Sequence, residues 1–144
     1  MSTPPAAAPS PARKRGASPP PEGGRAAATV QTLLETAERL FAEKGVDHVS
    51  LRQIVLASGQ RNLAALHYHF GSRAALVTEV LRVRREYVNA VRHRYLDELI
   101  ESGRAYGMRE LAAITIHALS DTVRDTAWGR RYVSVLAQTT LSPQ

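Results

Sequence analysis

Apolar residues along this chain recur at intervals of three and four, the period of an α-helix, from Thr29 to near the end. No segment shows the strict alternation of a half-buried strand, so the pattern predicts an all-α fold. The predicted helices span residues 29–44, 50 to about 57, 62–69, 72–101, 109–124 and 126–140.

The second predicted helix carries the clearest local start signal. Ser50 and Gln53 have the spacing of a capping box, in which each side chain binds the other residue's backbone N–H. Val49 and Ile54 have the spacing of a hydrophobic staple around the same start. Ser58-Gly59 then ends this helix after about two turns, because glycine breaks the helical pattern.

The third predicted helix begins at Asn62, a good N-cap, and is short. Two short helices joined by a glycine-containing turn and braced by a preceding helix form a helix-turn-helix, here at about residues 51–70. Residues 62–65 are Asn, Leu, Ala and Ala, small enough to let the second helix approach base edges in the major groove.

The fourth predicted helix starts after Gly71-Ser72 and ends at Ser102-Gly103. Its apolar positions keep to one face: Leu76, Val80, Val83, Tyr87, Val91, Tyr95 and Leu99. Arg82, Arg84 and Arg85 alternate with Glu79 and Glu86, which predicts a solvated face. The fifth helix carries Leu111, Ile114, Ile116 and Leu119 widely around its surface, which predicts burial on more than one side. Trp128 and Tyr132 of the last segment fit either a core or a ligand pocket.

The distribution of charge along the chain says more about function than the net charge does. The net charge is +6, and half of the excess lies in residues 1–28, which hold seven of the eight prolines and are predicted to form a disordered tail. This tail is either inert or adds a sequence-independent phosphate contact through Arg13, Lys14 and Arg15. From His48 to Thr78 the chain has basic residues and no Asp or Glu, so a polyanion meets no carboxylate there.

Several functional classes find no support. The chain has no cysteine, which excludes disulfides and thiol chemistry and favours a reducing, cytoplasmic setting. No apolar run reaches the ~18 residues of a membrane span. His67 and His69 lie two positions apart and point to different sides of a helix, so we expect no metal site. Phosphate-loop and nucleophile motifs are missing, and the carboxylates are expected on exposed helix faces or near helix ends, so we expect neither an enzyme nor a cofactor.

The helix-turn-helix region resembles the TetR family of bacterial regulators. The matching segments are Leu40-Phe41-Ala42-Glu43-Lys44-Gly45, Ser50-Leu51-Arg52-Gln53-Ile54, Ala57-Ser58-Gly59 and Tyr68-His69-Phe70-Gly71-Ser72-Arg73, followed by Leu76. The phrase Gly-Gln-Arg-Asn in the turn is similar to that of a subgroup with one extra turn residue. Val55 differs from the alanine usual in the motif, which predicts a slightly wider angle between the two helices.

The resemblance implies a homodimeric repressor that binds a palindromic operator in double-stranded DNA and is released by a small-molecule effector. It divides the chain into the tail (1–28), a DNA-binding domain (29–88) and a partial effector and dimerisation domain (89–144). The chain is expected to be C-terminally short, as a truncated product or a fragment. The alternative is a non-enzymatic interaction module that pairs with a full-length relative and binds DNA poorly alone.

The resemblance implies roles for residues of the DNA-binding domain. Asn62, Leu63, Ala64 and Ala65 are expected to face bases, although Asn62 also fits a simple cap, with Gln60 and Arg61 at the groove edge. The residues expected to contact phosphates are Ser50, Arg52, His67, Tyr68, His69 and Arg73. The predicted location is the bacterial cytoplasm, on the nucleoid.

Overall fold

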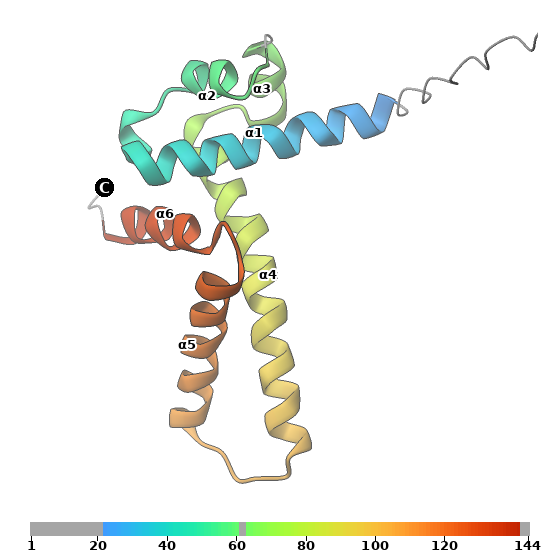
Figure 1. Cartoon of the computed structure of the whole chain (residues 1–144), viewed down its shortest axis with the longest axis vertical. Coiled ribbons are helices and arrows are strands. Elements are labelled where there is room, and N and C mark those ends of the chain that lie inside the picture. The colour runs from blue at the N-terminus through green and yellow to red at the C-terminus, as the bar shows by residue number, and fades with distance from the viewer. Residues whose placement is uncertain (1–21, 61–62, 142–144) are drawn as a thin grey trace, which may run out of the picture.

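A computed structural model describes residues 22–60 and 63–141 (Figure 1). Within these ranges the chain is helical and has no strand, as predicted. The elements are α1 (Glu22–Lys44), the 3-10 helix η1 (Val46–His48), α2 (Leu51–Ala57), α3 (Leu63–Phe70), α4 (Arg73–Glu101), α5 (Met108–Asp125) and α6 (Gly129–Leu141).

The helices form two parts, which we call the head and the hairpin. The head comprises α1, α2 and α3, with α1 lying across one end of α4 (Figure 1). The hairpin comprises α4 and α5, which pack side by side and project away from the head. Helix α6 then turns back from the hairpin and packs against α1, so that it contacts both parts.

The first helix starts earlier than predicted. It begins at Glu22 rather than Thr29, so residues 22–28 of the expected disordered tail are helical and that part of the prediction is wrong. The helix extends because Ala26, Ala27 and Ala28 have the highest helix propensity of all residues. Residues 1–21 of the predicted tail, including its basic cluster, lie outside the described residues.

The head closes on a single core. Its centre consists of large side chains that are less than 2 % exposed, drawn from α1, α2, α3 and the start of α4: Leu33, Phe41, Ile54, Leu66 and Leu76. The C-terminus of α1 is set by Gly45, whose φ of 92° is easy only for glycine and whose N–H donates to the Phe41 carbonyl at 3.0 Å. The predicted end of this helix at residue 44 is confirmed.

Helix α4 has the predicted extent but a wider buried surface. The one-face pattern correctly includes Leu76 and Val80, yet Val77, Leu81 and Val88 are buried as well. They are buried because α1, α5 and α6 all pack against this helix. Tyr87, which the pattern places inside, is 46 % exposed.

Helices α5 and α6 meet at a close backbone contact. A Cβ on Gly129 would lie 2.3 Å from the Thr122 carbonyl oxygen, so only glycine permits α6 to start this near to α5. Thr126 caps α5 by donating its N–H to the Thr122 carbonyl at 3.2 Å, and α6 begins only at Gly129. Trp128 therefore lies in the connection between the two helices and not in the last helix, where it was predicted. The expectation that α5 is buried on more than one side is wrong, since Ile116 is 64 % exposed.

Candidate nucleic-acid interface

Helix α2 begins with the reciprocal hydrogen bonds predicted for it. The Gln53 N–H donates to the Ser50 hydroxyl oxygen at 3.2 Å, and the Ser50 N–H donates to the Gln53 side-chain carbonyl at 2.7 Å. Val49 and Ile54 are both buried beneath this start, as a hydrophobic staple requires. The two orphan amides are thereby satisfied, and the start of the helix-turn-helix is confirmed.

The turn between α2 and α3 is formed by glycine and a backbone hydrogen bond. Gly59 has a φ of 72°, and the Gln60 N–H donates to the Val55 carbonyl at 3.2 Å. Arg61 and Asn62 lie outside the described residues. The side chains of Leu63 and Ala65 also lie outside them, so the roles expected for these four residues stay predictions: a place at the groove edge for Arg61 and base reading for the other three.

The described part of α3 has one buried and one open face. Leu66 is fully buried in the core of the head, whereas Ala64, His67, Tyr68 and His69 are exposed. Tyr68 is 87 % exposed and packs edge-on against His69, with ring centroids 5.5 Å apart. An exposed phenol and two imidazoles beside a small Ala64 make a surface that admits a duplex and offers donors to its backbone.

The flanks of this surface carry further donors. Arg52 on α2 is exposed. Ser50 uses its hydroxyl oxygen as an acceptor in the cap, which leaves the hydroxyl hydrogen to donate to a phosphate. No Asp or Glu occurs between His48 and Thr78, so the helices of this face carry no carboxylate of their own. Two carboxylates lie at its margins: Asp47 beside Arg73, and Glu79 in the lining of a small cleft with His69.

Comparison with known proteins agrees with this geometry. Residues 33–80 match the family model described as bacterial regulatory proteins, tetR family. The chain carries a TetR-family DNA-binding head. It is a DNA-binding transcriptional regulator, as the helix-turn-helix also indicates. A search of curated proteins finds no match to the chain.

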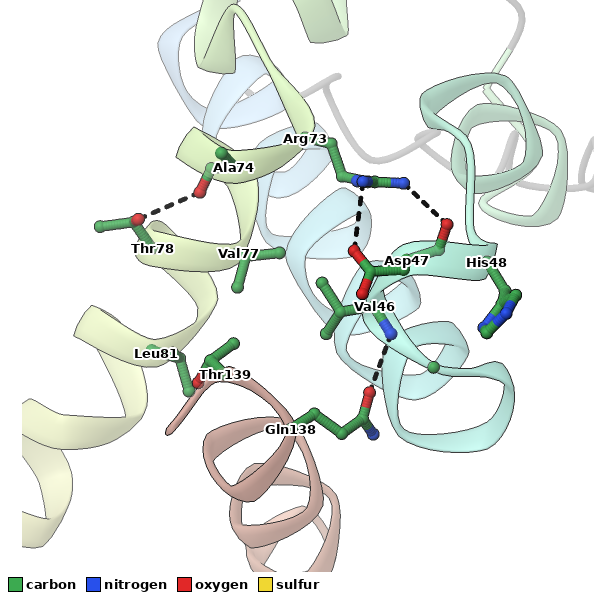
Figure 2. Close-up of a pocket in the computed structure, with 11 residues that line it drawn as sticks. Val46, Asp47, His48, Arg73, Ala74, Val77, Thr78, Leu81, Gln138 and Thr139 are labelled. Carbon is green, nitrogen blue, oxygen red and sulfur yellow. Dashed lines mark hydrogen bonds and ion pairs between the residues drawn. The ribbon is translucent and has the colours of Figure 1, made fainter. Parts of the chain in front are cut away.

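Arg73 of this TetR-family head has a partner within the protein. Its guanidinium donates to the Asp47 carbonyl at 2.9 Å and lies 3.3 Å from the Asp47 carboxylate, which ties η1 to the start of α4 (Figure 2). Both side chains remain substantially exposed, so the ion pair itself is weak. The phosphate contact expected for Arg73 stays a prediction, and within the protein Asp47 supplies the negative charge beside this arginine.

A cleft of about 560 Å³ lies beside this pair, between η1, α4 and α6. Val46, Val77 and Leu81 contribute its apolar lining, and Arg73 and Asp47 lie at one side (Figure 2). Gln138 of α6 holds the opposite wall. Its side-chain carbonyl accepts from the Val46 N–H at 2.8 Å, while its amide donates to the Phe41 carbonyl at 3.3 Å. The cleft therefore touches the entry to the helix-turn-helix and the last helix at once.

A buried charged junction, which was not predicted, lies where α1, α4 and α6 meet. The Glu38 carboxylate of α1 is fully buried and accepts two hydrogen bonds from the Arg84 guanidinium of α4, at 3.0 and 2.8 Å. Arg131 of α6 approaches the same carboxylate at 3.9 Å. Arg84 also lies over the Trp128 ring, 4.3 Å from its centroid. This Glu38 junction joins the head to both later helices.

The Glu38 junction corrects two expectations. Carboxylates were expected only on exposed faces or helix ends, and Arg84 was expected on a solvated face with its neighbours. Arg82 does lie on such a face, paired with Glu79 and Glu86, but the Arg84 side chain is only 14 % exposed. One sequence signal was present: Glu38 lies in the apolar stripe of the first helix, between Leu34 and Phe41.

The remaining histidines are isolated. His93 and His117 are exposed, and the His67 ring nitrogen lies 3.2 Å from the Gly71 carbonyl at the end of α3. Across the described ranges no three His, Asp or Glu side chains gather closely enough to hold a metal ion. None of the described helices is long and apolar enough to cross a membrane.

Proposed function

We propose that this chain is a repressor that binds a palindromic operator as a homodimer and is released by a small-molecule effector. The observation that carries the proposal is the exposed, acid-free face of α3, with Ala64, Tyr68 and His69 outermost on a head whose core is closed. Helix α3 enters the major groove, where each base pair presents a distinct pattern of donors and acceptors. The protein acts in the bacterial cytoplasm, on the nucleoid.

The roles divide between base reading and backbone contact. Asn62, Leu63, Ala64 and Ala65 face the bases, because only short side chains let the helix backbone come close. The groups that hold phosphates surround them: Ser50, Arg52, Gln60, Arg61, His67, Tyr68, His69 and Arg73. Arg73 reaches a phosphate by exchanging Asp47 for it, which its weak, exposed pair permits.

Effector release is supported by the cleft between η1, α4 and α6. A ligand there would contact Val46 and Arg73, at the two ends of the helix-turn-helix, together with Gln138 of α6. It would thus favour one position of the head relative to α6, which is what differential binding to two states requires. Ala74→Trp partly fills the cleft from an exposed position and is expected to abolish effector response while operator binding persists.

The test of DNA binding is a mobility shift over a salt series with intergenic DNA next to the protein's own gene. Arg52→Ala should lower affinity and reduce the salt slope by about 0.9, the value for one phosphate contact. Arg109→Ala removes the same charge from α5, far from the head, and should change neither. Equal effects of the two variants would mean that net charge and not this face binds DNA.

Base reading has its own test in Asn62→Ser. Serine is an equally good helix cap but lacks the amide that binds adenine through two hydrogen bonds. We expect the variant to fold normally and to lose about 1–3 kcal/mol of preference at one base pair. Unchanged preference would make Asn62 a cap alone.

The rival function is an interaction module that pairs with a longer relative. The exposed apolar residues of α5, Met108 and Ile116, are the observation in its favour. This rival predicts no salt-sensitive shift with any duplex unless the relative is added. Specific binding by the chain alone would exclude it.

A further inference from the structure

The cleft between η1, α4 and α6 changes from charged to apolar along its length. Arg73, Val77 and Leu81 follow one another in steps of four on α4, so their side chains form one row along the helix. This row is about 12 Å long at the helical rise per residue. Arg73 lies at one end, and beyond it Val77 and Leu81 form an apolar wall (Figure 2). The cleft thus offers a cation followed by an apolar surface.

The Arg73 guanidinium is held by one good contact and one weak contact. Its Nη1 donates to the Asp47 backbone carbonyl at 2.9 Å, which fixes the position of the group. Its Nη2 lies 3.3 Å from the Asp47 carboxylate, whose side chain is 74 % exposed, and such an ion pair is weak. A second carboxylate can therefore replace that of Asp47 at Arg73 while the backbone stays in place.

The threonines and the glutamine of the cleft are already bonded within the protein. Thr78 and Thr139 donate their hydroxyl protons to carbonyls of their own helices, at 3.0 and 2.9 Å. Gln138 binds backbone groups of α1 and η1 with both of its side-chain groups. Arg73 supplies the permanent positive charge of the lining, which selects an anion. A dianion would meet stronger repulsion from the Asp47 carboxylate, so a single negative charge is favoured.

We propose that this cleft binds a small carboxylate with an unbranched apolar chain, of the alkanoate class. The carboxylate takes the place of the Asp47 side chain at Arg73, and the chain lies along Val77 and Leu81. Asp47, which is already largely exposed, turns to solvent. The volume of about 560 Å³ is within the range of small-molecule sites.

The ligand and DNA compete for the same guanidinium. This part of the inference rests on the proposed function, in which Arg73 leaves Asp47 to hold a phosphate. A carboxylate in the cleft occupies Arg73 and brings a further negative charge to the edge of the DNA-binding face. Alkanoates are therefore expected to weaken operator binding by removing one phosphate contact.

Calorimetric titration of the full chain without DNA tests the site. For butanoate, hexanoate and octanoate, the dissociation constant should fall roughly tenfold with each added pair of methylenes, until the apolar row is covered. Octanamide has the same chain without the charge. It should bind at least about tenfold more weakly than octanoate, because a hydrogen bond between two charged groups is stronger than one to a neutral amide.

Paired variants test the two charged groups. Arg73→Gln should remove the preference for octanoate over octanamide. Arg85→Gln removes the same charge from an exposed position of α4 outside the cleft and should keep the preference. Asp47→Asn should tighten octanoate binding, because it removes the competing carboxylate. Its control is Glu43→Gln, which removes an exposed carboxylate outside the cleft and should leave the affinity unchanged.

Four results in these titrations would overturn the proposal. The first is that no alkanoate binds, and the second is equal affinity for octanoate and octanamide. The third is a preference that survives Arg73→Gln but is lost in His48→Gln, which would move the anion to another group of the lining. The fourth is octanoate binding that survives Ala74→Trp, which would place the ligand outside this cleft.

Mobility shifts separate this inference from the proposed function. Relative to the same concentration of sodium chloride, octanoate should weaken operator binding by the parent and lower the salt slope by about 0.9, the value for one phosphate contact. Ala74→Trp should bind the operator but not respond to octanoate. Operator binding that octanoate leaves unchanged, although it occupies the cleft, would refute the competition. A parent that binds octanoate through Arg73 but binds no DNA would refute the function alone.

Discussion

The head and the hairpin use their apolar residues in opposite ways. In the head, the large side chains of Phe41, Ile54 and Leu66 are all buried. In α5 the buried positions carry small residues, while Met108 and Ile116 point to solvent. The head thus buries most of its large apolar side chains, apart from Leu56 and Tyr68, whereas α5 leaves its largest ones at the surface.

The difference follows from how many elements surround each helix. Helix α1 contacts α2, α4, α6 and η1, so a wide apolar surface is covered. Helix α5 packs mainly on α4, with a smaller contact to α6, and such packing buries one stripe. Among the described residues, α5 therefore keeps Met108 and Ile116 exposed, whereas the head folds around a complete core.

The strongest test compares Phe41→Ala with Met108→Ala. Phe41 is fully buried, so truncation should lower the free energy of unfolding by about 3–5 kcal/mol through lost burial and a cavity. Met108→Ala, in dilute protein, should change it by less than about 0.5 kcal/mol. Urea unfolding followed by circular dichroism measures both. A large cost for Met108→Ala would mean that this side chain is covered in solution.

The next test concerns the Glu38 junction. Glu38→Gln leaves Arg84 and Arg131 without their carboxylate in a buried site, which should cost about 3 kcal/mol. Glu43→Gln is the matched control on the same helix, because its pair with Arg39 is exposed and should cost less than about 1 kcal/mol. If thermal unfolding shows similar losses of stability for Glu38→Gln and Glu43→Gln, the Glu38 junction does not hold the head to α4 and α6.

A smaller effect is expected at the start of α2. Ser50→Ala removes the acceptor for the Gln53 N–H and should cost about 1 kcal/mol. Ser120→Ala on the exposed surface of α5 changes the same group without a cap and should be close to neutral. If chemical denaturation finds Ser50→Ala neutral as well, the capping box contributes nothing to the head.

The smallest effect is a pH dependence in the hairpin. The Tyr95 hydroxyl donates to Asp121 and Arg124 lies nearby, and both lower the pKa of the Asp121 carboxyl below its ordinary value. A pKa lowered on folding stabilises the fold at neutral pH, and this stabilisation is lost as pH falls below about 4. Between neutral pH and roughly pH 3, the melting temperature of the parent protein should therefore fall further than that of Asp121→Asn. Equal losses would contradict the linkage.

Most of the secondary structure could be predicted because its signals are local. Ser50 with Gln53, Gly45, and Ser102-Gly103 act within a few residues of the boundaries they set, and the structure has those boundaries. The helix-turn-helix followed from the same signals. The start of α1 was misplaced because the prolines before it masked the helix propensity of Ala26–Ala28.

The long-range contacts could not be predicted in the same way. Arg73 was expected to contact a phosphate. Its partner within the protein, Asp47, could not be predicted, because it lies 26 positions earlier and only the fold brings the two together. The partners of Glu38 are even more distant, with Arg84 46 positions later. Nothing in the sequence around Gln138 indicates its role, because the groups that it binds belong to Val46 and Phe41, 92 and 97 positions earlier.

The sequence by itself determined the ends of most helices, although not the start of the first or of the last. It also determined that two helices form a helix-turn-helix and that residues 48–78, which contain it, hold no Asp or Glu. These properties depend on residues a few positions apart, whose geometry is set by the helix. Only the tertiary structure decided that Glu38 is buried, that Arg73 binds Asp47, and that Ile116 of α5 is exposed. Each depends on which helices pack together, and chain neighbours carry little information about contacts between distant segments.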